Sequence, residues 1–276
     1  MIAKITGKNR IEVFDLTQFD TDAILHSGQV FRYSRGTETS VYSLVVGQNK
    51  ARLYNEGGKV VIETDNPEFF WNYFDLDTNY TEIKEQLKKF ATLNRILGEN
   101  SGVGGIRILR GEFVETVISF IISANNNIKR FTKTLNLLSG QFGTDNCFPT
   151  LEQLSTLTAE DFKRLGCGYR SGYLVKAVAQ IAEMNFNDLC KLSVEQLKKT
   201  LTQIAGVGPK VASCIILFSD ILPNEERFRI CPVDVHIGRA LEQLGKEQAD
   251  VMLNHKYAGV IQQYIFYYVQ SLRKKL

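Results

Sequence analysis

The pattern of apolar and polar residues in the first third of the chain is mainly that of β-strands. Runs rich in β-branched and aromatic residues lie at about 40–46, 51–54 and 59–64, and the sequences between them, GQN and NEGG, are typical of hairpin turns. A further run of this kind, IEVFDL, starts at Ile11. Together these runs predict a small antiparallel sheet.

The spacing of apolar residues changes to the helical period after Asn66. Asn66 is a suitable N-cap and Pro67 a suitable first helical residue, and the segments FFWNYF and EIKEQLKKFATLNRIL that follow are predicted helices. From about residue 112 onward almost the whole chain carries helical patterns. Capping boxes are predicted at Thr150–Gln153 and Ser193–Gln196, and helix ends at Gly140, Gly166 and Gly206.

A glycine-rich segment, GENSGVGGIRILRGE, separates the strand pattern from the helical pattern. We place a domain boundary here, so that residues 1–104 contain the antiparallel sheet with flanking helices and residues 105–276 an all-α region. The predicted fold class is therefore α+β. The GVGG in this segment resembles a phosphate-binding loop, but no Gly-Lys-Ser/Thr follows it, which argues against that function.

The composition fits a soluble globular protein, because 44% of the 276 residues are apolar and 23% are charged. The formal net charge of +3 is too small to indicate nucleic-acid binding by itself, so a DNA-binding face would need local clusters of Lys and Arg. Five cysteines without a CxxC pair argue against a secreted disulfide framework and a zinc finger. The chain starts without an apolar signal region and has no run of about 18 apolar residues. We therefore expect an intracellular protein that does not enter a membrane.

The most informative stretch is VEQLKKTLTQIAGVGPKVASCIILF, residues 194–218. An amphipathic helix runs into Gly206 and Gly208, which permit a tight turn and the close approach of another backbone. Pro209 suits the first position of a second helix, whose free N–H groups then form a site for a DNA phosphate. The alternative is an ordinary corner between two helices of an all-α domain.

Lys210 lies at the second position of this predicted helix. A partly desolvated lysine near positive helix ends can lose its proton and become a nucleophile, although a lysine that only contacts phosphate is the simpler interpretation. Cys214, one turn later, shares a face with Lys210. A lone cysteine in an apolar helix is most often a core residue.

A second segment, CPVDVHIGRAL, contains a candidate partner for the lysine. Pro232 disfavours helix before it, so Asp234 is placed as the N-cap of a helix that carries His236. The charged form of a carboxylate is favoured at a helix N-terminus. A role as a cap alone remains open, but the separation of 24 residues between Lys210 and Asp234 permits both side chains to face one cleft.

These two segments resemble the helix–hairpin–helix DNA glycosylase superfamily, with its Gly/Pro-rich hairpin and its aspartate, and most closely the 8-oxoguanine DNA glycosylases of the eukaryotic type. The resemblance spans about residues 12–272. Further segments that share it are HSGQVFRYS, GIRILRGEFVETVISFIISANNNIKR, LGCGYRSGYL and YAGVIQQYIFYYVQ. It implies an N-terminal sheet of the TATA-binding-protein type followed by an all-α helix–hairpin–helix core.

The resemblance implies roles in catalysis and phosphate binding. Lys210 corresponds to the nucleophilic lysine that attacks C1′ of the damaged nucleotide, and Asp234 to the carboxylate that supports departure of the base. His236 corresponds to a residue near the phosphate that flanks the lesion. The hairpin is implied to contact DNA phosphate through Gly206, Gly208 and Val211.

Recognition of the damaged base is implied for four residues. Cys214 and Phe266 correspond to two walls that sandwich the extruded base. The Gly28 carbonyl corresponds to the group that accepts the N7–H of 8-oxoguanine, which guanine lacks. Gln262 corresponds to the amide that contacts the Watson–Crick edge. Apart from the resemblance, Phe266 would be taken as a core aromatic residue.

Four more residues are implied to fill the gap in the duplex. Asn125 corresponds to the residue that occupies the vacated position, Tyr169 to the wedge beside it, and Arg130 and Arg170 to a pair that hydrogen-bonds the orphaned cytosine. Without the resemblance, Asn125 would mark a helix end and the two arginines would be surface charges.

The resemblance implies excision of 8-oxoguanine opposite cytosine, followed by strand cleavage through a lysine Schiff base. The chemistry needs no metal or organic cofactor, the partner is double-stranded DNA containing an oxidised purine, and we expect a monomer located with the genomic DNA. Three alternatives remain: an oxidised-pyrimidine glycosylase–lyase, an alkylpurine glycosylase, and a non-catalytic DNA-binding module. The missing four-cysteine motif argues against the first, Lys210 against the second, and Lys210 with Asp234 against the third.

Overall fold

The computed structural model describes residues 2–37, 41–98, 102–233, 238 and 246–274, which belong to two compact units. Unit 1 consists of Met1–Leu44, Lys50–Arg110 and Phe228–Leu276, and unit 2 of Val45–Asn49 and Gly111–Arg227. The α+β class is confirmed, because an antiparallel sheet precedes a helical core. The boundary between residues 104 and 105 stays a prediction.

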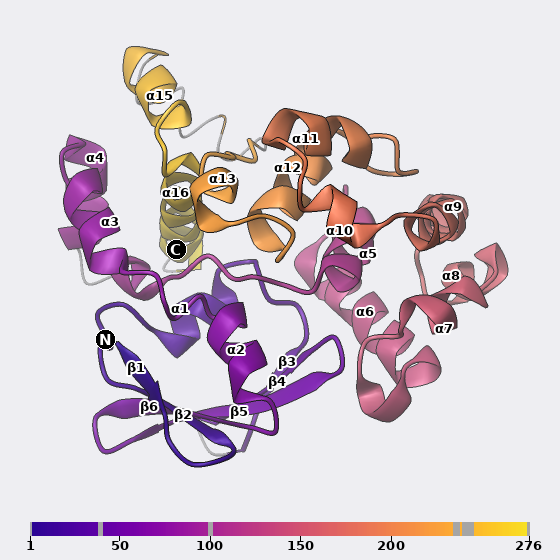
Figure 1. Ribbon diagram of the computed structural model, residues 1–276, viewed down its shortest axis with the longest axis horizontal. Helices are drawn as coiled ribbons and strands as arrows, with labels where there is room; N and C mark the ends of the chain where they lie inside the picture. The colour runs from indigo at the N-terminus through magenta and orange to yellow at the C-terminus, as the bar shows by residue number, and fades with distance from the viewer. Residues whose placement is uncertain (1, 38–40, 99–101, 234–237, 239–245, 275–276) are drawn as a thin grey trace. The chain divides into compact units, whose positions relative to one another are not determined.

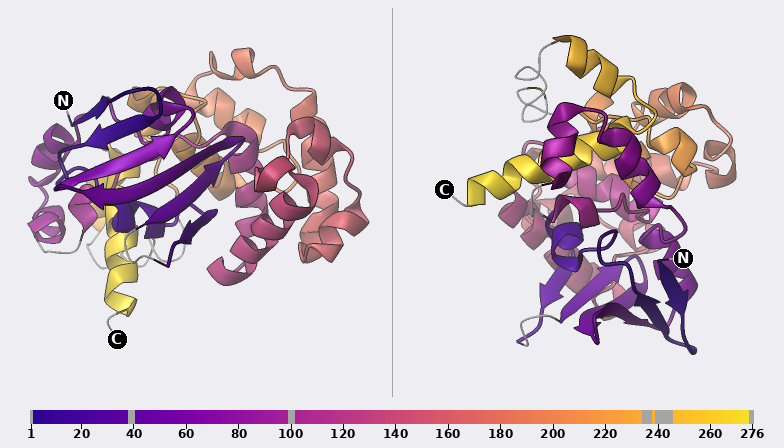
Figure 2. Two further views of the ribbon diagram at one scale, coloured as in Figure 1. Left: turned by 90° about the horizontal axis from the view of Figure 1, so that it is seen from below. Right: turned by 90° about the vertical axis from the view of Figure 1, so that its left-hand side faces the viewer.

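A six-stranded sheet, in the order β1-β2-β6-β5-β4-β3, forms the base of unit 1 (Figures 1 and 2). The strands are β1 (Ala3–Ile5), β2 (Arg10–Val13), β3 (Tyr33–Arg35), β4 (Tyr42–Val46), β5 (Asn49–Glu56) and β6 (Lys59–Thr64). The predicted NEGG turn joins β5 to β6 through Gly57 and Gly58, whose φ angles of 57° and 79° are those of a two-residue hairpin turn. The sequence pattern therefore located this hairpin correctly.

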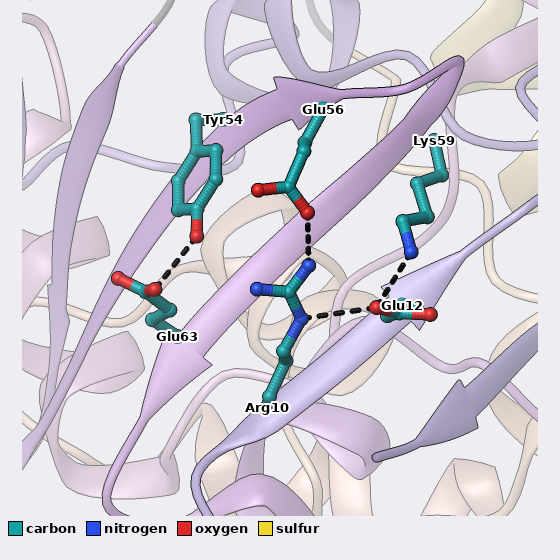
Figure 3. Close-up of polar contacts among 6 residues, drawn as sticks. All are labelled: Arg10, Glu12, Tyr54, Glu56, Lys59 and Glu63. Atoms are coloured by element: carbon teal, nitrogen blue, oxygen red, sulfur yellow. Dashed lines mark hydrogen bonds and ion pairs between the residues drawn. The ribbon is translucent and has the colours of Figure 1, made fainter.

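Polar side chains of β2, β5 and β6 form a network of hydrogen bonds and ion pairs on one face of the sheet (Figure 3). Val61 faces Glu12 on one neighbouring strand and Tyr54 on the other, and it is 0% exposed. Glu12 accepts from Arg10 Nε at 3.0 Å and from Lys59 Nζ at 2.7 Å. Each surface ion pair of this kind contributes only about 0–1 kcal/mol to stability.

Helices pack on the other face of the sheet and around the C-terminal helix of unit 1. They are α1 (Thr21–His26), α2 (Pro67–Tyr73), α3 (Tyr80–Leu87), α4 (Ala91–Gly98), η1 (Val103–Gly105), α15 (Lys246–Leu253) and α16 (Ala258–Lys274). Helix α2 contacts β2 and β6, and α16 contacts α4 and η1 (Figure 1). As predicted, Asn66 caps α2 through Phe69 N, and Pro67 is its first residue.

Arg107 lies inside unit 1 and is 0% exposed. Its guanidinium donates to the carbonyl oxygens of Phe74 at 2.8 Å and Thr78 at 2.8 Å, and it lies 4.3 Å from the Tyr80 ring centroid. A buried cation needs such acceptors to offset its lost hydration. Arg107 therefore fixes the segment after η1 against the turn after α2, and this segment contacts the loop after α1.

Unit 2 is helical and is built around α5. Its helices are α5 (Phe113–Ser123), α6 (Ile128–Phe142), η2 (Thr144–Asn146), α7 (Leu151–Ser155), α8 (Ala159–Arg164), η3 (Gly168–Arg170), α9 (Ser171–Ala182), α10 (Phe186–Leu189), α11 (Val194–Leu201), α12 (Pro209–Phe218) and α13 (Asn224–Arg227). Helix α5 contacts α6, α9 and α12, which is why its apolar residues lie on all sides. Phe120 of α5 stacks on Phe218 of α12, with ring centroids 5.8 Å apart.

The predicted helix ends of unit 2 are mostly found. Capping boxes are present at Thr150 with Gln153 and at Ser193 with Gln196, and Gly166 follows α8 with a φ of 90°. The prediction at Gly140 is wrong, because α6 continues through it to Phe142. Leu135 and Leu138 of α6 are fully buried, and this packing outweighs the roughly 1 kcal/mol cost of a glycine inside a helix.

Glu112 caps α5 from a buried position. Its carboxylate accepts from Glu115 N at 2.7 Å and Val114 N at 3.2 Å. The pKa of Glu112 is raised from 4.5 to about 7, chiefly because the carboxyl group is buried; the two backbone N–H groups oppose this rise, and the nearby Glu115 and Asp220 add to it. The folded chain therefore keeps a proton on Glu112 that the unfolded chain has released.

We expect Glu112→Gln to stabilise the chain in a pH-dependent way. The contribution of protonated Glu112 is complete below pH 4.5 and is lost as pH rises to about 7. Between pH 5 and pH 8, the variant should therefore gain about 2–3 kcal/mol in unfolding free energy relative to the parent chain. Urea denaturation at both pH values measures this, with the exposed Glu152→Gln as control. A difference that does not change with pH would contradict the assignment.

Candidate active site and DNA interface

The predicted hairpin is present between α11 and α12. Gly206 has a φ of 84°, and a Cβ atom added there would lie 3.2 Å from both Ile121 Cγ2 and Tyr173 Cβ. Gly208 is the N-cap of α12, and Pro209 is its first residue. Among the residues that the structure describes, no side chain caps this helix, so its first backbone N–H groups have neither an intrahelical nor a side-chain acceptor there. A phosphate oxygen is the type of ligand that such a helix start binds.

Lys210 and Cys214 differ sharply in burial. Lys210, at the second position of α12, is exposed, whereas Cys214 one turn later is 2% exposed. The exposure of Lys210 differs from the partly desolvated lysine expected from the sequence. Lys210 is exposed because it lies in the first turn of α12, directly after the exposed hairpin residues Gly208 and Pro209. Desolvation of the amine would therefore have to come from bound DNA.

Asp234 and His236 lie outside the described residues. The predicted proximity of Lys210 and Asp234 thus stays a prediction. The described residues contain no group of three or more His, Cys, Asp and Glu side chains arranged to hold a metal ion. Similarly, none of the described helices is long and apolar enough to cross a membrane.

Three of the predicted base-recognition residues lie on two segments of unit 1, the residue after α1 and helix α16. Gly28 follows α1 with a φ of 82°, and a Cβ atom added to it would lie 2.9 Å from Phe266 Cε1. Phe266 and Gln262 are one turn apart on α16, so they share a face of that helix. The Gln262 side-chain oxygen is buried and has no hydrogen-bond partner among the described residues. An aromatic wall, a backbone carbonyl and an unpaired amide oxygen therefore come from two adjacent segments.

The predicted gap-filling residues come together within unit 2. Asn125 follows α5 with a φ of 49°, a conformation that asparagine tolerates better than most residues, and it is exposed. Arg170 is 5% exposed and donates to the carbonyl oxygens of Asn125 at 2.9 Å and Ala124 at 2.8 Å. Its guanidinium also lies 4.4 Å from the ring centroid of Tyr169. Arg170 thus joins the Asn125 loop to the predicted wedge.

Arg130 and Tyr173 extend this surface. Arg130 is exposed, and its one hydrogen bond to a neighbouring loop, to the Gly166 carbonyl, is long at 3.4 Å. Tyr173 was not singled out from the sequence, but it is 48% exposed and its ring contacts that of Tyr169 edge-on at 6.5 Å. Because Tyr173 also lies beside Gly206, it connects the wedge to the hairpin. The sequence could have indicated Tyr173, because it follows Tyr169 by four residues and so could lie on the same side of a helix.

Two family models match consecutive parts of the chain. The model described as the N-terminal domain of 8-oxoguanine DNA glycosylase matches residues 13–117. The model described as the HhH-GPD superfamily of base excision DNA repair proteins matches residues 118–254. The second match includes the hairpin and Lys210.

Relatives and solved structures agree with these matches. The chain is 30% identical to the N-glycosylase/DNA lyase of Saccharomyces cerevisiae over 78% of its own length and 65% of the yeast protein. It is 29% identical to the Arabidopsis thaliana N-glycosylase/DNA lyase, over 84% of this chain and 68% of that protein. The chain thus spans about two thirds of the length of these relatives.

A crystal structure of the Clostridium acetobutylicum 8-oxoguanine glycosylase/lyase, in complex with duplex DNA containing cytosine opposite 8-oxoguanine, is 30% identical. It matches with a TM-score of 0.87 over 99% of this chain and 100% of that one. Taken with the two family models, this match shows that the chain belongs to the 8-oxoguanine DNA glycosylase family within the helix–hairpin–helix superfamily of base excision DNA repair proteins.

Proposed function

We propose that this chain excises 8-oxoguanine from duplex DNA and then cleaves the strand as a lyase. The observation that carries the proposal is the arrangement of Gly28, Gln262 and Phe266 in unit 1. The Phe266 ring lies beside Gly28, whose backbone is in the left-handed region. The ring suits stacking on a planar base, and the Gly28 carbonyl suits the additional N–H donor that 8-oxoguanine has and guanine lacks. The unpaired buried oxygen of Gln262 suits a donor on the edge of the same base, since such a group costs about 1–3 kcal/mol until it finds a partner.

The hairpin and its surroundings supply the DNA-binding part of the proposal. The base must leave the stack before it can be bound, which costs a few kcal/mol. Asn125 and Tyr169 offset this cost by filling and wedging the vacated position, and the start of α12 holds a backbone phosphate. The exposed rings of Tyr169 and Tyr173 add apolar area to the same surface.

We propose that Lys210 carries the covalent step. Its neutral amine attacks C1′, the bond from C1′ to the base breaks, and one amine proton leaves with the base. The C1′–O4′ bond then breaks and O4′ takes up a proton, which leaves a protonated imine between C1′ and the lysine nitrogen. This imine acidifies C2′–H, and loss of that proton drives β-elimination of the 3′ phosphate. Asp234, as an ionised carboxylate, would stabilise the positive charge that develops on the sugar, and His236 would contact the flanking phosphate.

For the partner base, we propose contacts from Arg130 and Arg170 to the orphaned cytosine. Arg130 is exposed and thus available for such a contact. Arg170 already donates to the carbonyls of Ala124 and Asn125, so we also propose that it holds the Asn125 loop. Two guanidinium groups that only donate favour cytosine, which offers acceptors on its pairing edge, over adenine.

A panel of lesions in duplex DNA tests the proposal. We expect cleavage of 8-oxoguanine opposite cytosine to be at least 10-fold faster than opposite adenine, since an unmatched hydrogen-bonding partner costs about 1–3 kcal/mol. Thymine glycol and 3-methyladenine duplexes represent the oxidised-pyrimidine and alkylpurine alternatives. Faster cleavage of either would replace the proposed substrate, and binding without cleavage of any lesion would favour the non-catalytic module.

A further inference from the structure

The Gly28 carbonyl, which we propose recognises the lesion, lies between Ser27 and Gln29. Both of these neighbours form hydrogen bonds to other parts of unit 1. Helix α1 ends at His26, Ser27 is its C-cap, and Gly28 follows in the left-handed region. The Ser27 side chain donates to the Ile24 carbonyl at 2.7 Å, so Ser27 closes the helix end. Among the residues that the structure describes, none donates a hydrogen bond to the carbonyl of Gly28 itself.

Gln263 holds the peptide immediately before Gly28. Its side-chain amide donates to the Ser27 carbonyl at 2.5 Å, and Gln263 is 1% exposed. It lies next to Gln262 and three residues before Phe266 on α16. One hydrogen bond thus ties the backbone of the recognition segment to the helix that carries the two other recognition groups.

Gln29 holds the peptide after Gly28. Its side-chain nitrogen, Nε2, donates to Ser27 Oγ at 2.9 Å and to the Arg107 carbonyl at 2.9 Å. Its side-chain oxygen, Oε1, accepts from Leu109 N at 2.9 Å. Since Arg107 is itself anchored to several carbonyls, Gln29 fixes the segment to a rigid part of unit 1.

We infer that Gln263 and Gln29 are positioning residues for lesion discrimination. Neither is assigned contact with the base. They set where the Gly28 carbonyl lies relative to Gln262 and Phe266, and discrimination depends on that placement because a hydrogen bond weakens steeply with distance and angle. This inference rests on the proposed function, in which the Gly28 carbonyl accepts the N7–H of 8-oxoguanine.

Gln263→Met is the main test, because methionine has a similar length but cannot donate a hydrogen bond. We expect the preference for 8-oxoguanine duplex over guanine duplex, measured as a ratio of dissociation constants in a Lys210→Gln background, to fall about 10-fold or more. Cleavage of a duplex with a preformed abasic site, measured with Lys210 intact, should stay within about 2-fold, because no base has to be recognised there.

Gln18→Met is the matched control. Gln18 is 4% exposed in the same unit, and its side chain accepts from Thr81 N at 3.1 Å and donates to Asp15 Oδ2 at 2.6 Å, neither of which belongs to the segment Ser27–Gln29. The control should retain the preference. If Gln263→Met does not fold, Gln29→Leu tests the same clamp from the other side and should give the same split between the two assays.

The outcomes separate the inference from the function on which it rests. An unchanged preference in folded Gln263→Met, or an equal loss of preference and abasic cleavage, would overturn the positioning role. A parent chain without any preference for 8-oxoguanine would instead contradict the proposed function.

Discussion

Borohydride treatment of the Lys210→Gln variant on an 8-oxoguanine duplex is expected to yield no covalent complex, whereas the parent chain should be trapped. An imine requires a primary amine, and the glutamine amide cannot form one. Strand cleavage should fall by at least about 1,000-fold, as the loss of a covalent nucleophile does in other enzymes. Electrophoresis of the reduced reaction measures the adduct, and a denaturing gel measures cleavage of the strand.

The controls must separate the loss of the nucleophile from the loss of a charge. Lys199→Gln removes one exposed charge from the last turn of α11, on the other arm of the hairpin, and should still form the adduct. Lys210→Arg keeps the charge at residue 210 but should not form the adduct. An undiminished adduct in Lys210→Gln would show that another amine is the nucleophile.

The second large effect is expected for Gly28→Ala. The new Cβ atom would lie 2.9 Å from Phe266 Cε1, so the ring must move away, and the φ of 82° is strained for any residue with a side chain. We expect excision of 8-oxoguanine to fall by about 10- to 100-fold, equivalent to about 1.4–2.7 kcal/mol. Single-turnover excision measures this, and cleavage of a preformed abasic site should fall less.

Gly58→Ala is the matched control for backbone strain. Gly58 has a φ of 79°, but nothing lies within 4 Å of a Cβ atom added there. Both variants carry the strain of a positive φ, but only Gly28→Ala also displaces the Phe266 ring, so only Gly28→Ala should lose excision. Thermal unfolding of both variants checks that each is folded. Equal excision by the two variants would show that the contact between Gly28 and Phe266 plays no part in recognition.

Short sequence patterns predicted the strands, turns and helix ends, because these features depend mainly on neighbouring residues in the chain. Runs rich in β-branched and aromatic residues located β4, β5 and β6, whereas the three-residue strands β1 and β3 are too short to give such a signal. The contact between Gly28 and Phe266 joins residues 238 positions apart. Such a pairing depends on tertiary packing, so only the resemblance to a known family predicted that these two residues act together.

The same limit applies to the candidate site. Lys210 and Pro209 were placed correctly at the start of α12, because helix-start signals are local. The exposure of Lys210 was not predicted, since burial depends on the rest of the fold. Gln263 was missed for a similar reason: a glutamine in a helix rich in aromatic residues carries no sign that its amide holds a distant carbonyl.

The hydrogen bonds from Arg170 to the carbonyls of Ala124 and Asn125 hold the Asn125 loop in one conformation before any DNA is bound. Ordering a loop residue costs about 1–2 kcal/mol of backbone entropy, and here that cost is met when the chain folds. The Asn125 loop is therefore already ordered when the protein meets an intact base pair. We expect the dwell time at each base pair to depend on how readily the duplex opens there, so that the protein stays longer at weakly stacked steps than at stable ones.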